Sequence, residues 1–332
     1  MRELSRNFFN DLKSGILLPI FKYVKSDSTI FLEIRDGFIN LYYRGGNLLK
    51  ISEKADGYKI AFDTNYFLDK STNEYINIKN LFLNLKNVNN NNNFIPDLIA
   101  NIPILKSEMD KWFTKKTKLE REIQQILVKE NNINLCQKSD YFIIDIEYTY
   151  KNDNGIYARF DAVGVKWESD GVSRKRTKNL QLSFIELKFM DSTLKNSSGI
   201  LKHIMDINDF CSDNKKISCV KNEMKNIFAI KSELGCIENQ NKIESFSEEK
   251  PELILILANH DPDSNILKEL LEQIIINNDT ISLKNIENYQ NKKLFIDIKI
   301  ATSNFFGYGL YKESIYSLDD FRKKFYSQIY NK

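Results

Sequence analysis

Hydrophobic and polar positions in the first hundred residues follow short strand-like runs. A helical stretch at residues 3–24 comes first, and Gly15 and Pro19 interrupt or end it. Four runs rich in Ile, Phe, Tyr and Leu follow, at residues 29–35, 38–43, 48–52 and 58–62. The runs are separated by dipeptides that contain glycine, which tolerates the positive φ of tight hairpin turns: Asp36-Gly37, Gly45-Gly46 and Asp56-Gly57. The pattern predicts a small antiparallel meander.

A run of five asparagines at residues 89–93 marks the best candidate for a domain boundary. It follows a helical pattern around residues 78–85. Five consecutive asparagines cannot bury a face, so this stretch is typical of a surface loop or linker. We therefore expect a β-rich N-terminal domain of unknown role at residues 1–100 and a second domain at residues 101–332.

The second half alternates long helical and strand-like patterns. Helices are predicted at residues 105–131 and 199–210, from 263 or 264 to about 276, and from 318 onwards; strands are predicted at residues 141–149, 156–165, 180–189, 252–258 and 293–301. Ser317 and Asp320 resemble a capping box at the last helix. The order is helix, three strands, helix, strand, then additions, which indicates an α/β (α+β) fold with a mixed sheet.

Composition limits the possible classes of protein without choosing one. The chain has 332 residues, a formal net charge of +3 and 42% hydrophobic residues, which is ordinary for a globular protein. Its four cysteines include no C-x-x-C pair, so we expect reduced thiols. No signal peptide or membrane-sized apolar run is evident, and we expect a cytoplasmic protein. The mild charge neither requires nor excludes a nucleic-acid partner.

The segment Phe184-Ile-Glu-Leu-Lys-Phe189 places an acid and a base inside an apolar strand. Period-two alternation puts Glu186 and Lys188 on one face. Asp161 lies among apolar residues of the preceding strand, and it can converge with Glu186 if the two strands pair. Two carboxylates suit Mg²⁺ or Mn²⁺, and a lysine beside them can orient water and stabilise charge on a phosphate. These residue types are those that metal-assisted phosphodiester hydrolysis needs.

Asp161 followed by Glu186-Leu187-Lys188 resembles the signature of the PD-(D/E)XK nuclease superfamily, and the element order resembles its αβββαβ core. The resemblance covers roughly residues 105–260. It implies a metal-dependent nuclease in which Asp161 and Glu186 bind the metal and Lys188 is the catalytic lysine. It also implies a glutamate on the leading helix, for which we favour Glu120 over Glu122. Phe160 stands where the name-giving proline would be.

Two further groups of residues are candidates for substrate contact. The helix after the third strand often carries a polar residue that faces the site in this superfamily; Lys202, His203 and Asp206 are available, and we favour His203. The basic segment of Arg174, Lys175 and Arg176 lies in the loop between the two strands of the site. We expect that loop at the rim of the site, where it can bind phosphates. A solvated hairpin tip explains it equally well.

Several of these residues also have purely structural explanations. Glu186 and Lys188 can form an ion pair on a half-exposed strand. Asp145 and Glu147 are typical of the solvated face of an outer strand, although either can lie near a metal. His260-Asp-Pro-Asp263 is too tightly spaced for a metal site, and Asp263 has a helix-capping role available.

The function predicted from the sequence is Mg²⁺-dependent cleavage of nucleic acid. DNA is the expected substrate, and restriction or other defence against foreign DNA is the expected setting, by analogy with the superfamily. Assembly as a homodimer or with a partner protein of a defence system is compatible with this prediction. The alternative is a catalytically inactive nuclease fold that acts as a nucleic-acid-binding or scaffolding module.

Overall fold

The computed structural model describes residues 2–84, 94–132, 138–152, 155–195, 199–237, 241–260, 264–284, 286–301 and 309–326. Two compact units make up the chain. The first comprises Met1–Gln125 and Asn226–Gln240, and the second comprises Ile126–Lys225 and Asn241–Lys332. The division falls within two helices, α5 (Leu119–Asn132) and α7 (Asn214–Glu233).

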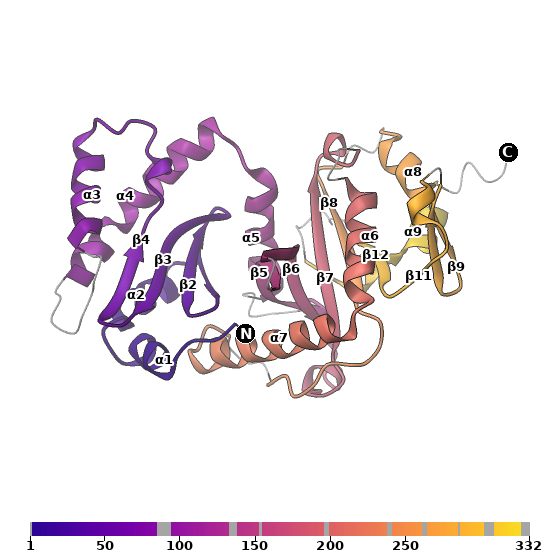
Figure 1. Cartoon of the computed structure of the whole chain (residues 1–332), viewed down its shortest axis with the longest axis horizontal. Helices are drawn as coiled ribbons and strands as arrows, with labels where there is room; N and C mark the ends of the chain where they lie inside the picture. Colours follow the sequence, from indigo (N-terminus) through magenta and orange to yellow (C-terminus); the bar gives the residue numbers. More distant parts are fainter. Residues whose placement is uncertain are drawn as a thin grey trace. The chain divides into compact units, whose positions relative to one another are not determined.

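The first unit is built on a four-stranded antiparallel sheet with the order β1-β2-β3-β4 (Figure 1). Its elements are α1 (Arg6–Lys13), α2 (Leu18–Ser26), β1 (Ile30–Ile34), β2 (Phe38–Tyr43), β3 (Gly46–Lys54), β4 (Gly57–Ala61), η1 (Thr64–Tyr66), α3 (Asn73–Asn84) and α4 (Phe94–Lys115). The predicted meander is confirmed. Gly37, Gly45 and Gly57 all have positive φ at its turns, which a residue with a Cβ rarely adopts.

Helix α4 belongs with this meander, so the two units divide at residues other than 100 and 101. It packs against α2, α3 and β3, and it buries Leu98, Ile102, Leu105 and Met109. The asparagine run at residues 89–93 lies outside the described residues.

The second unit contains a six-stranded mixed sheet with the order β13-β12-β8-β7-β6-β5 and a three-stranded antiparallel sheet with the order β11-β10-β9. The strands of the larger sheet are β5 (Tyr141–Asn152), β6 (Gly155–Lys166), β7 (Gln181–Phe189), β8 (Glu252–Ala258), β12 (Asp297–Ala301) and β13 (Ile315–Ser317). β5, β6 and β7 pair antiparallel, and β7, β8 and β12 pair parallel. The predicted mixed α/β class with a mixed sheet is confirmed.

The remaining elements of this unit connect or flank the sheet. They are η3 (Ser173–Lys175), η4 (Asp191–Thr193), α6 (Ile200–Cys211), α8 (Ile266–Leu271), β9 (Ile274–Asn277), β10 (Thr280–Leu283), η5 (Glu287–Tyr289), β11 (Lys292–Lys293), η6 (Lys312–Ser314) and α9 (Leu318–Tyr326). Helix α6 lies against β7 (Figure 1). Phe210 of α6 contacts the stacked rings of Phe160 on β6 and Phe184 on β7, whose centroids are 4.4 Å apart. This aromatic stack fixes the helix to the sheet.

Three predictions about helices need correction. The helix expected at residues 105–131 is two helices, because α4 ends at Lys115 and α5 starts at Leu119. The helix expected to reach residue 276 ends at Leu271, and β9 and β10 follow as a hairpin. The sequence analysis did not predict α7. By contrast, the capping box of α9 is confirmed, because Ser317 Oγ accepts from Asp320 N and donates to Asp320 Oδ2.

Among the helices of the described ranges, none is both long enough and apolar enough to cross a membrane.

Candidate functional site

Glu186 and Lys188 lie inside the second unit, on the central strand β7. This strand is paired on both sides, antiparallel to β6 and parallel to β8, so its side chains are covered on both faces. Glu186 is 2% exposed and Lys188 is 8% exposed. Lys188 Nζ lies 3.9 Å from Glu186 Oε2. The expectation of a half-exposed surface pair is therefore wrong, and the acid and base are interior groups.

His203 of α6 completes a cluster with these two residues. Its Nδ1 lies 2.9 Å from Glu186 Oε2, and its Nε2 lies 3.5 Å from Lys188 Nζ. The approach to Glu186 lacks hydrogen-bond geometry, so Glu186 Oε2 has no hydrogen-bond partner among the described residues. Glu186, Lys188 and His203 are called the Glu186 cluster below.

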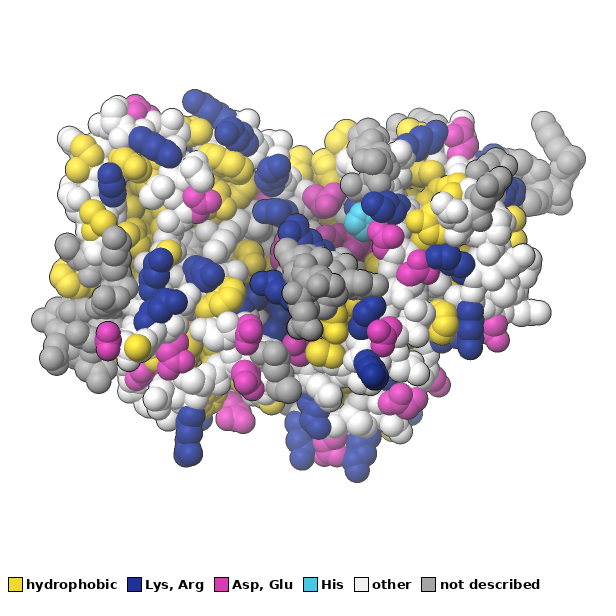
Figure 2. Space-filling model, viewed as in Figure 1, with side chains coloured by type: hydrophobic (Ala, Val, Ile, Leu, Met, Phe, Trp, Pro, Cys, Tyr) yellow, Lys and Arg dark blue, Asp and Glu magenta, His cyan; other side chains and the backbone are white. Residues whose placement is uncertain are grey.

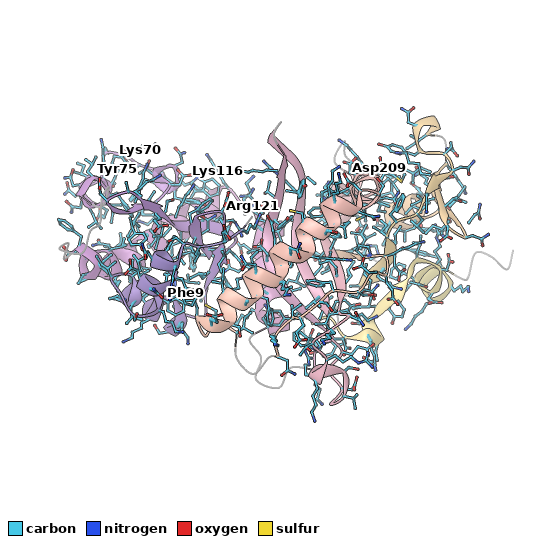
Figure 3. All side chains as sticks on the ribbon, turned by 60° about the horizontal axis from the view of Figure 1, so that its bottom comes forward. Phe9, Lys70, Tyr75, Lys116, Arg121 and Asp209 are labelled. Atoms are coloured by element: carbon cyan, nitrogen blue, oxygen red, sulfur yellow. The ribbon has the colours of Figure 1, made fainter. Side chains whose placement is uncertain are left out.

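The other polar residues of α6 point elsewhere. Lys202 and Asp206 are exposed. Asp209, which Figure 3 shows on this helix, pairs with Lys292 Nζ at 2.6 Å. His203 is thus the residue, of the three considered, that contacts the cluster; its binding of nucleic acid stays a prediction.

Asp161 lies opposite Glu186 where β6 and β7 separate. The ladder between the strands ends at Ala162 and Ile185, so the next pair in register is Asp161 and Glu186. Instead of continuing the ladder, the Leu187 amide donates to Asp161 Oδ2 at 2.8 Å. The Asp161 carboxylate is therefore bonded to the backbone between Glu186 and Lys188.

Side-chain alternation along β6 is interrupted at Asp161. Val163 opposes Phe184, so strict alternation would place Phe160 on the other face from Phe184. Phe160 instead stacks on Phe184 and contacts Phe210. On β5, Glu147 lies between the paired residues Ile146 and Tyr148 and has a φ of 51°. Both strands thus bend at the level of Asp161, and alternation alone does not give the direction of its carboxylate.

The prediction that Asp145 lies on a solvated strand face is wrong. Asp145 is 0% exposed. A bulge between Ile143 and Asp145 shifts the register of β5, which changes the face that each following residue occupies. Glu147 is half-buried, and the register places it opposite Asp161.

Glu120 lies in the first turn of α5, in the part of the helix assigned to the first unit. It is half-buried and precedes Arg121, which Figure 3 shows near the start of α5. Its alternative, Glu122, already pairs with Arg44 Nη2 at 2.9 Å, in the turn between β2 and β3. A role of Glu120 at the metal stays a prediction.

The basic loop lies at the far end of the β6–β7 hairpin, and the expectation that it lies at the rim of the site is wrong. Lys166 and Gln181 form the last pair before the loop. Asp161 lies five residues before Lys166, a distance of about 17 Å along the strand. Arg174 Nη2 donates to Ser139 O, and burial lowers the pKa of its guanidinium. Lys175 and Arg176 are exposed, so contact with a phosphate remains a prediction for these two above all.

The surface does not resolve this question by charge alone. Figure 2 shows Lys and Arg side chains interspersed with Asp and Glu on the visible face of the second unit. A protein surface of mixed sign does not attract nucleic acid through its overall field. Binding would depend on particular contacts.

The residues of the cluster fit a hard divalent cation. Magnesium in proteins is held by one or two carboxylates, with water and substrate phosphate completing its six ligands. Asp161 and Glu186 supply two carboxylates in opposed register, and Glu186 Oε2 is a buried oxygen without a hydrogen bond among the described residues. Within the same residues, no three of His, Cys, Asp and Glu are grouped closely enough to hold a metal by themselves. The donor set thus suits a cation that shares its ligands with the substrate.

Sequence reasoning missed two buried polar arrangements in the same unit. Glu252 of β8 is 1% exposed; Tyr141, Ser183 and Lys166 surround it. Asp191 and His260 pair at 2.8 Å beyond the ends of β7 and β8. A signal existed for the second pair: each residue directly follows a predicted apolar strand, and parallel neighbours end at the same edge of a sheet.

No family model matches the chain, and searches of curated proteins and of solved structures find no significant match. The case for a function therefore rests on the residues of the site.

Proposed function

We propose that this chain is a metal-dependent nuclease with a PD-(D/E)XK-like centre, and that DNA is its substrate. One observation carries the proposal: Glu186 and Lys188 are buried on β7, and the amide of the residue between them binds Asp161. Burying a carboxylate and an ammonium costs free energy that an apolar pair would avoid. Such groups are retained where chemistry needs them.

The order of elements supports the same proposal. Helix α5 is followed by the antiparallel strands β5, β6 and β7, then by α6 and α7, and then by β8, which is parallel to β7. This order agrees with the αβββαβ arrangement that the resemblance implies, with α7 as an addition.

The roles follow from the positions of the side chains. Asp161 and Glu186 would hold Mg²⁺ or Mn²⁺, which polarises the phosphate and lowers the pKa of bound water. Lys188 places a cation beside Glu186, where it can orient water and offset charge that develops on the phosphate. His203 fixes the Glu186 carboxylate from the side of α6.

A second function, an inactive binding or scaffolding module, is favoured by a different observation. Lys188 and His203 both approach Glu186 within 4.0 Å, so the cluster can balance its charge without a metal. The two proposals differ in what a divalent ion does to the protein.

The test is incubation of the purified chain with plasmid, linear duplex DNA, single-stranded DNA and RNA, each with Mg²⁺, Mn²⁺ or EDTA. Cleavage that requires the metal and disappears in Asp161→Asn supports the nuclease. The matched control is Asp206→Asn, which changes an exposed carboxylate on α6 and should cleave like the wild type. A wild-type chain that binds nucleic acid equally in Mg²⁺ and EDTA and cuts none of the four would support the scaffold.

A further inference from the structure

A histidine and a buried aspartate meet where two parallel strands end. β7 and β8 pair up to Phe189 and Ala258, and the Met190 amide donates to Ala258 O at 2.9 Å just beyond. Asp191 opens η4, and His260 follows β8. His260 Nδ1 lies 2.8 Å from Asp191 Oδ1. Neither residue belongs to the Glu186 cluster.

The aspartate is buried more deeply than an ordinary surface partner of a histidine. Asp191 is 7% exposed, and its Oδ2 has no hydrogen-bond partner among the described residues. The His260 side chain is 27% exposed. A buried carboxylate thus holds an imidazole that reaches solvent.

The orientation of the ring selects proton transfer over metal binding. Nδ1 faces the carboxylate, so Nε2 lies on the far side of the imidazole. Asp191 Oδ1 and His260 Nε2 therefore cannot bind one ion, and a 2.8 Å contact leaves no room for a cation between Oδ1 and Nδ1. A carboxylate that accepts from Nδ1–H fixes the tautomer and stabilises the imidazolium, which is how histidine is prepared as an acid or base.

The backbone on both strands is unusual at this point. Met190 has a φ of 64° and Asn259 a φ of 54°, and each directly precedes a member of the pair. Methionine in this left-handed region is uncommon and costs free energy. Close by, burial and then the charge of Asp191 raise the pKa of Tyr326 to about 12, so its hydroxyl stays protonated beside the carboxylate.

We propose that His260, oriented by Asp191, is a general acid that protonates the leaving oxygen during phosphodiester cleavage. This inference rests on the proposed nuclease function. Asp191 lies three residues beyond Lys188, or about 10 Å along the strand direction, at the same carboxyl edge of the sheet. A nucleic-acid strand that occupies the Glu186 cluster can extend to this edge.

The step balances without another reagent. The oxygen of water forms a bond to phosphorus, and the bond from phosphorus to the leaving sugar oxygen breaks with its electron pair on that oxygen. The proton on His260 Nε2 transfers to the leaving oxygen, and the imidazole becomes neutral while Asp191 keeps its Nδ1–H. The proton lost by the attacking water passes to bulk water, and bulk water later restores the imidazolium.

The experiment compares leaving groups. Short oligonucleotides carry either the normal oxygen or sulfur at the bridging position of the cleaved linkage, and both are cut in Mn²⁺ by the full chain. A thiolate leaves without a proton, so His260→Gln should slow cleavage of the oxygen substrate by about 100-fold or more and slow the sulfur substrate by only a few fold. Asp191→Asn should give the same selective loss to a smaller degree.

The matched control is Lys195→Gln, which breaks an exposed ion pair with Glu269 between the segment after η4 and α8. It should cut both substrates at the wild-type rate. Thermal unfolding of each variant establishes that it is folded, and Asp191→Asn, which is nearly isosteric, gives a second test if His260→Gln unfolds.

Other outcomes overturn the inference in distinguishable ways. Equal rates for His260→Gln and the wild type on the oxygen substrate remove His260 from the reaction but leave the nuclease proposal standing. An equal loss on both substrates shows that the pair only supports the structure. A folded wild-type chain that cuts neither substrate overturns the nuclease proposal and this inference together.

Discussion

Glu186 and Glu252 are buried in neighbouring strands of one sheet, yet their surroundings differ. Glu252 Oε2 accepts from Tyr141 Oη at 2.8 Å and from Ser183 Oγ at 3.3 Å, and Lys166 Nζ lies 3.3 Å from Oε1. Burial, and then the Glu252 charge, raises the pKa of Tyr141, so the phenol remains a donor. Both carboxylate oxygens of Glu252 are satisfied.

Glu186 has cations near it but less complete bonding. His203 Nδ1 and Lys188 Nζ lie 2.9 and 3.9 Å from Oε2, and that oxygen has no hydrogen bond among the described residues. A satisfied buried network stabilises a fold, whereas an incompletely satisfied one costs stability. The difference separates a glutamate that holds the sheet together from one that is available to a ligand.

Replacing the two lysines should give opposite results and the largest effect. Lys188→Met removes the cation of the Glu186 cluster and should slow cleavage by about 100- to 1,000-fold, because the developing phosphate charge loses a fixed positive group. Lys166→Met should leave the rate of the folded enzyme unchanged and lower the free energy of unfolding by about 1–3 kcal/mol, because Glu252 loses a partner. The measurements are cleavage rates with Mg²⁺ and thermal unfolding.

A Lys188→Met protein that cuts at the wild-type rate would remove Lys188 from the mechanism. Equal stability losses in the two variants, with no change in rate, would place both clusters in the same structural class.

Neutralising each glutamate sharpens the comparison through stability alone. Glu252→Gln should reduce the free energy of unfolding by about 1–3 kcal/mol, because three donors lose a charged acceptor. Glu186→Gln, measured in EDTA, should be within about 1 kcal/mol of the wild type or more stable, because its orphaned oxygen has no hydrogen bond to lose. A larger loss for Glu186→Gln than for Glu252→Gln in denaturant unfolding would reverse the assignment.

The basic loop should contribute to binding and not to cleavage. Lys175→Glu with Arg176→Glu should weaken nucleic-acid binding and flatten its salt dependence by roughly one unit of slope per lost phosphate contact. The control reverses Lys195 and Lys250, two exposed lysines of the same unit, and so makes the same change in net charge. Identical salt slopes for the two double variants would leave the loop as a solvated turn.

The smallest effect concerns the turn that orders this loop. Backbone hydrogen bonds, first from Ser173, lower the pKa of Asp170 to about 2 from 3.8. A depressed carboxyl pKa stabilises the turn fully above the unfolded value, and this contribution is lost as pH falls through the folded value. NMR titration of the Asp170 side chain should therefore give a midpoint near 2. A midpoint at the ordinary value would show that the carboxylate does not bond the turn in solution.

The fold could be predicted where local sequence chemistry determines it. The dipeptides at Gly37, Gly45 and Gly57 correctly placed the turns of the meander, and alternation correctly placed β7. The break between α4 and α5 carries no glycine or proline, only Lys115-Lys-Thr-Lys118. The β9–β10 hairpin has an apolar run that suits a helix or a strand, and only pairing distinguishes them.

The site was predictable only as far as strand periodicity holds. Glu186 and Lys188 share a face because β7 is regular, and their contact confirms that part of the prediction. The bulge at Asp145 and the bend at Asp161 depend on pairing between strands, which no local pattern shows. His203 and the pair of Asp191 and His260 depend on how distant segments pack.

The aromatic stack of Phe160, Phe184 and Phe210 has a consequence for the order of folding. The three rings come from β6, β7 and α6, which follow one another along the chain, whereas β8 and β12 arrive only after α7. Contacts between neighbouring segments lose less chain entropy on closing than distant ones. The stack can therefore assemble first as a kinetic nucleus, so that Lys188 and His203 are brought together before the later parallel strands complete the sheet around them.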